Sequence, residues 1–248
     1  MSFRKFKLLS ALLAVSFSFY SAAEAAALKV ATEATFPPFE FLDDSGKPIG
    51  YDMDIIKAIA EEQGIEIEII NMPFDGIIPA LMTSQVDASL AGMTITEERA
   101  KKVDFSDPYY KSGISALVRK DTADKFKKIS DLKDSVLCAQ IGTTGAMKAK
   151  EISGKVTSFN TNPEAMMELK AKGCDAVVND RPVNLYFMSK GQDKSVVEIP
   201  EILSSEQYGI AVRKGNTELL NLLNEGLKKI RDNGKFTEIH RKWFAVDE

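Results

Sequence analysis

Residues 51–70 read YDMDIIKAIAEEQGIEIEII, and this stretch decides the fold class. Over 51–63 the apolar side chains recur at the spacing of one helix face, which predicts an amphipathic helix. Gly64 is a typical helix stop, and residues 65–70 then alternate as in a half-buried strand. A helix followed directly by a strand is the building unit of α/β folds.

The same alternation continues on both sides of this unit. A strand is expected at 28–32, then a helix after Asp75 and a strand at 86–91. The spacing of Thr94 and Glu97 matches a capping box, which predicts a helix that begins there. Further strands are expected at 135–140, 155–160 and 174–179, and further helices at 144–151, 162–172, 181–190, 216–234 and 235–244. This rhythm predicts a doubly wound α/β fold.

Two β-rich segments interrupt the alternation. Residues 107–118 and 204–212 divide the chain into parts of ordinary domain size. Two α/β lobes joined by two such crossings would place a ligand cleft between the lobes, because open α/β sheets bind ligands beyond the carboxyl ends of their strands. The sequence therefore predicts a binding cleft at this junction.

Residues 1–27 differ in composition from the rest of the chain. Basic side chains at 4–7 precede an apolar run at 8–20, which is too short for a membrane span of about 20 residues. Small residues end the segment, which is typical of a secretory signal peptide cleaved after Ala25 or Ala27. An uncleaved membrane anchor is the alternative. We expect a soluble exported protein.

Composition and charge exclude several classes of protein. The 248 residues are 44% hydrophobic and 27% charged, which excludes wholesale disorder. The formal net charge of −4 argues against nucleic acid as a partner, because a phosphate-binding surface needs an excess of basic side chains. His240 is the only histidine and no CxxC spacing occurs, so neither a zinc site nor a histidine-dependent triad is expected.

Two cysteines, Cys138 and Cys174, lie in strand-like runs. Export would permit a disulfide between them. Buried cysteines, however, usually serve as small apolar side chains, and the sequence does not fix the separation of the two Cα atoms. We therefore expect two buried thiols, with a disulfide as the alternative.

Eight short motifs occur in order along the chain. They are ATEATFPPFEF (31–41), GYDMD (50–54), FDGIIPAL (74–81), AGMTITEER (91–99), DFSDPYY (104–110), GTT (142–144), DAVVND (175–180) and KWF (242–244). Together they resemble the polar amino acid-binding proteins of ABC uptake systems, above all the members that bind glutamine, arginine, or lysine and histidine. The resemblance implies a type II periplasmic-binding-protein fold. It places lobe 1 at 28–108 plus 209–248, lobe 2 at 114–203, and hinges near 109–113 and 204–208.

The chemistry at several of these positions suits a zwitterionic amino acid. Arg99 offers a planar fork that matches a carboxylate, and it lies in the first turn of an expected helix, where N–H groups favour an anion. Thr94 adds a hydroxyl, Gly92 lets the backbone approach an ammonium group, and Asp180 is the ammonium partner. The resemblance implies that the amide of Thr144 completes the carboxylate site. On pattern alone, Arg99 equally fits a surface arginine and Asp180 a helix cap.

The resemblance also implies a side-chain pocket lined by Glu33, Phe36, Phe74 and Gln140. The two phenylalanine rings suit a planar guanidinium or an amide, although on pattern alone they fit core positions better. A carboxylate at Glu33 favours arginine, lysine or ornithine, unless it is merely a loop residue, and it would repel an acidic ligand. Glutamine-binding relatives carry Lys in place of Gln140 and His in place of Asn179. We therefore expect a basic amino acid, arginine foremost, with glutamine as the alternative.

Three classes of function remain. The main expectation is a monomeric periplasmic receptor that captures an L-amino acid by lobe closure and delivers it to a membrane ABC permease, without a cofactor or metal. Some proteins on this fold are dehydratases of the cyclohexadienyl or arogenate type, so a cleft enzyme using Glu33 is an alternative of another class. A soluble sensor or adhesin is the third.

Overall fold

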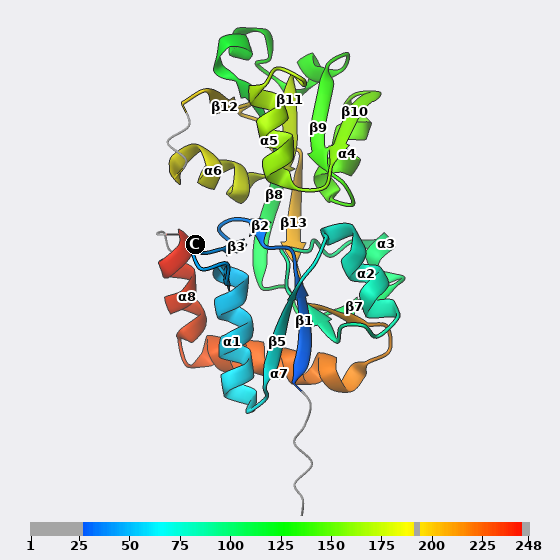
Figure 1. Cartoon of the computed structure of the whole chain (residues 1–248), viewed down its shortest axis with the longest axis vertical. Coiled ribbons are helices and arrows are strands. Elements are labelled where there is room, and N and C mark those ends of the chain that lie inside the picture. Colours follow the sequence, from blue (N-terminus) through cyan, green and yellow to red (C-terminus); the bar gives the residue numbers. More distant parts are fainter. Residues whose placement is uncertain (1–26, 191–193, 245–248) are drawn as a thin grey trace, which may run out of the picture.

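The computed structural model describes residues 27–190 and 194–244, and it consists of two α/β lobes connected by two strands (Figure 1). The expected signal peptide lies outside these residues, apart from Ala27. Within the described ranges, no helix combines the length and the apolar character needed to cross a membrane.

Lobe 1, the lower part of Figure 1, is built on a five-stranded sheet with the order β5-β1-β6-β14-β7. Its strands are β1 (Leu28–Thr32), β5 (Ile67–Asn71), β6 (Ala88–Ser89), β7 (Val103–Phe105) and β14 (Ala211–Arg213). Its helices are α1 (Tyr51–Gln63), α2 (Phe74–Met82), α3 (Glu97–Ala100), α7 (Thr217–Asp232) and α8 (Lys235–Phe244). β14, α7 and α8 bring the end of the chain back to the lobe in which the described chain begins.

Helices cover both faces of this sheet because its strands alternate. Val30 of β1 packs in the core under α1 and α7, whereas the next residue, Ala31, packs under α2 on the opposite face. Gly226 permits the close contact of α7 with α1, since a Cβ there would lie 2.6 Å from Cγ2 of Ile59. The expected doubly wound architecture is confirmed.

Lobe 2 contains a six-stranded sheet with the order β10-β9-β11-β8-β12, in which β13 also pairs with β8. Its strands are β8 (Tyr110–Arg119), β9 (Val136–Gln140), β10 (Lys155–Phe159), β11 (Ala176–Asp180), β12 (Val196–Glu198) and β13 (Ser204–Tyr208). Its helices are α4 (Thr144–Ile152), α5 (Asn162–Lys170) and α6 (Arg181–Lys190), with 3-10 turns η1 (Lys120–Lys125) and η2 (Ile129–Leu132). β9, β10 and β11 are parallel, so their carboxyl ends meet at one edge of the sheet.

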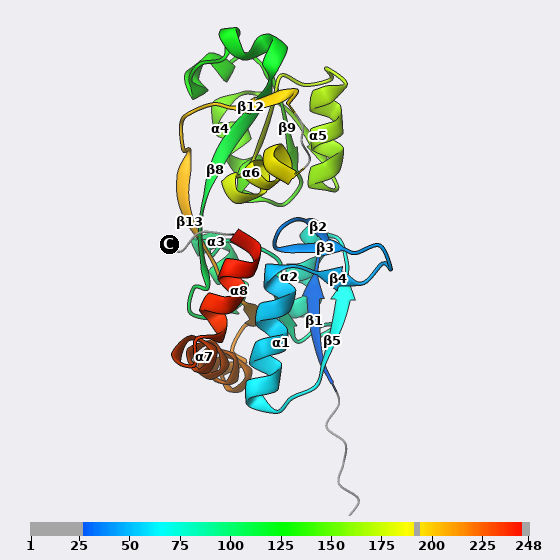
Figure 2. The same ribbon diagram turned by 90° about the vertical axis from the view of Figure 1, so that its left-hand side faces the viewer.

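The two crossings between the lobes are the antiparallel strands β8 and β13 (Figure 2). Tyr110 lies opposite Tyr208 at one end of this ladder, and Ile114 lies opposite Ser204 at the other. The crossings are therefore hydrogen-bonded to each other as one ribbon.

A small sheet, which the sequence did not predict, lies on the side of lobe 1 that faces lobe 2 (Figure 2). It consists of β2 (Thr35–Phe36), β3 (Glu40–Leu42) and β4 (Pro48–Ile49). The prolines at 37 and 38 indicated a loop, and strands of two or three residues are too short to show a period of two. Gly50 links this sheet to α1 with φ of 136°, where a Cβ would lie 2.0 Å from the Phe39 carbonyl oxygen.

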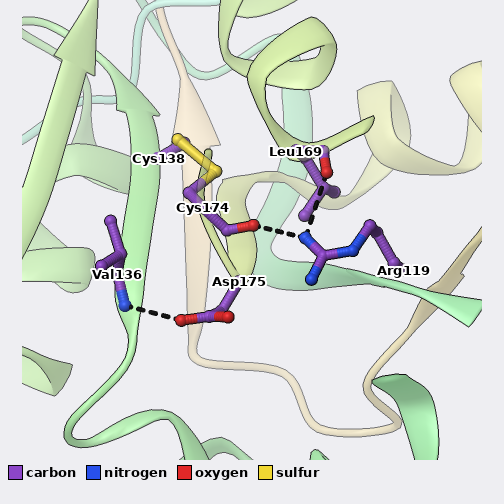
Figure 3. Close-up of a disulfide and its surroundings, with 6 residues drawn as sticks. All are labelled: Arg119, Val136, Cys138, Leu169, Cys174 and Asp175. Carbon is purple, nitrogen blue, oxygen red and sulfur yellow. Dashed lines mark hydrogen bonds between the residues drawn. A yellow bond between two sulfur atoms is a disulfide. The ribbon is translucent and has the colours of Figure 1, made fainter. Parts of the chain in front are cut away.

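The expectation of two free thiols is wrong, because Cys138 and Cys174 form a disulfide (Figure 3). Cys138 lies on β9, Cys174 lies just before the adjacent strand β11, and their Cα atoms are 6.0 Å apart. Arg119 of β8 donates hydrogen bonds to the carbonyl oxygens of Cys174 at 2.5 Å and Leu169 at 3.1 Å. The bridge depends on the pairing of β9 with β11, which brings together two cysteines 36 residues apart. Neither cysteine's local sequence specifies this contact.

Candidate functional site

A small cavity lies between the two lobes. Glu33 reaches it from the end of β1, whereas Gln140 and Asp180 reach it from the carboxyl ends of β9 and β11. The other lining residues are Phe36, Glu40, Phe74, Ala91, Gly92, Thr94, Arg99, Thr143 and Thr144. All nine residues singled out in the sequence therefore meet in one place, and Glu40, Ala91 and Thr143 join them.

Arg99 forms one end of the cavity. Its side chain is buried, with 5% exposed, and Nη1 donates to the Thr94 carbonyl oxygen at 2.7 Å. Nη2 donates at 3.0 Å to the carbonyl oxygen of Gly142, which belongs to lobe 2, and the guanidinium lies 5.4 Å from the Phe74 ring centroid. Burial lowers the pKa of Arg99, while the charges of Asp180 and Glu206 oppose this shift. A guanidinium group is not deprotonated in proteins, so the site holds a fixed positive charge.

The expected helix start at Thr94 is wrong. The cap of α3 is Thr96, whose Oγ1 accepts a hydrogen bond from the Arg99 amide at 3.2 Å. The amide of Arg99 is therefore engaged, and the four-residue helix α3 supplies its side chain to the cavity rather than an anion site at its N-terminus. Thr94 stands three residues before Glu97, as a capping box requires, whereas Thr96 stands three residues before Arg99. The sequence pattern therefore favoured the wrong threonine.

Asp180 lies at the end of β11 with 4% of its surface exposed. One carboxylate oxygen accepts hydrogen bonds from the hydroxyls of Tyr208 and Ser112, the latter at 3.2 Å. Burial raises the pKa of Asp180 to about 7, and the charge of Glu206 acts in the same direction. A cation bound beside this carboxylate would favour its ionised form.

Glu33 and Gln140 form a contact between the lobes at another part of the cavity. Oε2 of Glu33 accepts a hydrogen bond from Nε2 of Gln140 at 3.2 Å, and its Oε1 accepts one from the Thr35 hydroxyl. The Gln140 amide also donates to the Asn160 carbonyl oxygen at 3.1 Å. Burial raises the pKa of Glu33, with 5% of the residue exposed, although both hydrogen bonds favour the carboxylate.

Gly92 has a left-handed backbone with φ of 52°, and a Cβ there would lie 3.2 Å from the Phe36 ring. Its N–H donates at 2.8 Å to the buried carboxylate of Asp52, which also accepts a hydrogen bond from the Tyr109 hydroxyl at 2.7 Å. Burial raises the pKa of Asp52 to about 6, and burial together with the Asp52 charge raises that of Glu40 well above its ordinary value. This carboxyl pair supports the wall of the cavity from within lobe 1.

Three polar residues at the site were missed from the sequence. Thr143 caps α4, because its Oγ1 accepts a hydrogen bond from the Ala146 amide at 3.1 Å. Glu40 is the first residue of β3, and in the sequence it stands between Phe39 and Phe41. An acidic residue between two aromatic residues was the signal that could have identified it. Glu206 could also have been identified from the sequence, because it is the only acidic residue in the β-rich crossing 204–212.

The fold and the site together define a class of protein. Two doubly wound α/β lobes, a two-stranded connection and a polar cavity between the lobes are the features of type II periplasmic binding proteins. The chain belongs to the bacterial extracellular solute-binding proteins, family 3, whose model matches residues 28–246.

Three similar proteins indicate what such sites bind. The L-arginine-binding protein of Pseudomonas aeruginosa is 34% identical, over 98% of this chain and 98% of its own. An ancestral arginine-binding protein, solved with arginine and with glutamine, is 45% identical with a TM-score of 0.84. Each of its two structures matches 98% of that chain, and they match 88% and 89% of this one. The ancestral amino acid-binding protein AncCDT-1, a precursor of cyclohexadienyl dehydratase, is 43% identical over 88% of this chain and 95% of its own, with a TM-score of 0.81.

Proposed function

We propose that this protein is an exported receptor that captures a basic L-amino acid, with arginine preferred, and delivers it to a membrane ABC permease. One observation carries the proposal. A single cavity between the lobes contains the cation Arg99, the carboxyl group Asp180 and a further carboxylate, Glu33. An amino acid with a cationic side chain presents the complementary set of charges.

The zwitterionic part of the ligand would lie between Arg99 and Asp180. A carboxylate accepts paired hydrogen bonds from a guanidinium fork, and the amide of Thr144, in the first turn of α4, adds a donor that a helix leaves without an intrahelical partner. The ammonium would donate to Asp180. Both groups are present in every α-amino acid, so this part of the site selects the class of ligand and not the individual ligand.

The side chain of the ligand would extend between Phe36 and Phe74 toward Glu33. Buried carboxylates are unfavourable without a partner, so a guanidinium or ammonium group beside Glu33 would stabilise its ionised form. Glutamine is the second candidate, because the Gln140 amide can pair with another amide and the ancestral relative was solved with glutamine.

Ligand capture would move lobe 1 (28–108 plus 209–248) against lobe 2 (114–203) about hinges near 109–113 and 204–208. Arg99 belongs to lobe 1, whereas Asp180 and Thr144 belong to lobe 2, so one ligand would contact both lobes and stabilise the closed arrangement. Family membership supports export through the signal peptide at 1–27 and delivery to a permease. We propose that the receptor acts as a monomer in the periplasm.

We also propose that the protein is not an enzyme. A dehydratase is the competing class, and one relative is named as the precursor of such an enzyme. His240, the only histidine, lies on α8 among aromatic rings, 5.1 Å from the Phe244 centroid, and it is not part of the cavity lining. Asp180 is suited to an ammonium group, which a cyclic acid without an amine lacks.

Calorimetric titration of the mature chain with all twenty amino acids and ornithine tests the proposal. Arginine should bind at 1:1 stoichiometry and more tightly than glutamine, and glutamate should not bind. Tighter binding of glutamine would favour the alternative ligand. Absence of binding to every basic and amide amino acid would overturn the proposal, and turnover of prephenate or arogenate would place the chain among the enzymes.

A further inference from the structure

Glu206 lies on the crossing strand β13, at its midpoint, with 8% of its surface exposed. One carboxylate oxygen, Oε2, accepts hydrogen bonds from two threonine hydroxyls, at 2.6 Å from Thr94 and 2.8 Å from Thr144. Its second oxygen accepts a hydrogen bond from the Ser204 hydroxyl at 3.0 Å. A single hinge carboxylate therefore contacts the cavity wall of both lobes.

The two threonines belong to different lobes. Thr94 follows β6 in lobe 1, where it forms an isolated bridge with Tyr208, and Thr144 is the first residue of α4 in lobe 2. Their hydroxyls meet at one oxygen atom in the arrangement in which Arg99 reaches the Gly142 carbonyl and Glu33 reaches Gln140. Rotation of one lobe away from the other would separate at least one hydroxyl from Glu206.

Donor capacity decides what these hydroxyls can do. A threonine hydroxyl has one hydrogen to donate, and in both cases Glu206 accepts it. A ligand carboxylate is also only an acceptor. A threonine hydroxyl could therefore donate to the ligand only by giving up its hydrogen bond to Glu206. Arg99 and the backbone amide of Thr144 remain as the donors for the ligand.

We infer that Glu206 is a positioning residue that latches the closed form by holding Thr94 and Thr144 together, without touching the ligand. The inference rests on the proposed function only in that the ligand is taken to close the lobes. Hydrogen bonds to a charged group are among the stronger ones in proteins, and both form here in a site shielded from water. The latch would thus slow ligand release and act alike on every ligand, because it lies away from Glu33 and Gln140.

A double-mutant cycle between Glu206→Ala and Thr144→Val tests the latch, with arginine and glutamine as probes. Each single variant should weaken both ligands by about 10- to 100-fold through faster dissociation, with the association rate unchanged. Thr144→Val in the Glu206→Ala background should weaken binding little further, because its partner is already gone. Additive losses would overturn the latch and show that the Thr144 hydroxyl serves the ligand directly.

Two comparisons separate the latch from a general structural role. Gln207→Ala removes an exposed side chain from the same strand and should leave affinity and dissociation rate unchanged. Glu206→Gln keeps an acceptor oxygen and should restore part of the affinity lost in Glu206→Ala. If Glu206→Ala instead changes the ratio of arginine to glutamine affinity, Glu206 acts on the ligand and the inference is wrong.

A measurement without ligand keeps the latch testable if the proposed function fails. Labels attached through Gln85→Cys in lobe 1 and Met167→Cys in lobe 2, both at exposed positions, report the separation of the lobes. Glu206→Ala and Thr144→Val should each shift the distance distribution toward longer separations, and the double variant should equal either alone. An unchanged distribution in Glu206→Ala overturns the latch, whereas absence of binding by every amino acid overturns only the proposed function.

Discussion

The Arg99 and Glu33 regions of the cavity both join the two lobes, but they do so with different partners. Arg99 carries a permanent charge and donates to a backbone carbonyl of lobe 2, a group that every residue type possesses. Glu33 instead accepts from the side-chain amide of Gln140, so its pairing depends on residue identity in both lobes. The difference teaches that one join is independent of the lobe 2 side chain while the other is specific to it. Under the proposed function, the Arg99 region would recognise what all amino acids share and the Glu33 region would vary with the ligand.

Arg99→Ala should have the largest effect on binding. Removing one partner of a buried charge pair costs about 2–5 kcal/mol, so affinity for every α-amino acid should fall by at least about 30-fold. Titration of arginine, lysine and glutamine gives the measurement, and Arg213→Ala, at an exposed position on β14, is the matched control. If the variant lost affinity for arginine but not for glutamine, the Arg99 region would not be the one that recognises all α-amino acids.

Asp180→Asn should rank second and should also change the pH dependence of binding. The pKa of Asp180 is about 7 in the folded chain without ligand, so its carboxyl must lose a proton to pair with an ammonium group. Wild-type affinity should therefore decline as the pH falls below about 7, and the asparagine variant, weaker throughout, should show a flatter profile. Equal pH profiles for the two proteins would contradict the role of Asp180.

The same carboxyl predicts a stability profile. An unfolded aspartate titrates near pH 3.9, whereas folding raises the pKa of Asp180 to about 7, so the folded chain holds this proton more tightly. The stability that this group contributes is present below about pH 4 and is lost as the pH rises to about 7. Thermal unfolding without ligand should show a smaller decline over this window in Asp180→Asn than in the wild type.

Glu33→Gln should have a smaller and selective effect. The amide keeps a hydrogen-bond acceptor but removes the charge, so arginine and lysine should lose about tenfold in affinity while glutamine changes little. The ratio of the affinities for arginine and glutamine is the quantity to measure. Glu68→Gln, at an exposed position on β5, is the control for a change of net charge. Equal losses of affinity for arginine, lysine and glutamine would show that Glu33 does not select among ligands.

The disulfide should matter least for affinity. Replacing Cys138 and Cys174 together by alanine should lower the free energy of unfolding by about 2–4 kcal/mol, because the bridge limits the unfolded chain of lobe 2. Ligand affinity should remain within about twofold of the wild type, since neither cysteine lines the cavity. Chemical denaturation with and without dithiothreitol checks the first expectation, and a large loss of affinity would contradict the second.

Local patterns predicted the elements well, because most of them depend on residues close in sequence. Gly64 ends α1 with φ of 63°, as a helix stop should, and the strands expected at 135–140 and 155–160 appear within a residue of their expected limits. The disulfide and the carboxyl pair of Glu40 with Asp52 depend on contacts between distant segments, which periodicity does not encode. The resemblance, and not the pattern, brought the nine cavity residues to notice.

The pairing of Ile114 with Ser204 has a consequence for the architecture of the chain. Because these residues are neighbours across one ladder, the segment between them leaves lobe 1 and returns to it at adjoining points. Such a segment is an insertion in the topological sense, with its two ends already side by side. Lobe 2 of a relative can therefore be grafted into this chain at these two positions without lengthening either connection. The chimera would combine one protein's Arg99 region with another's Gln140.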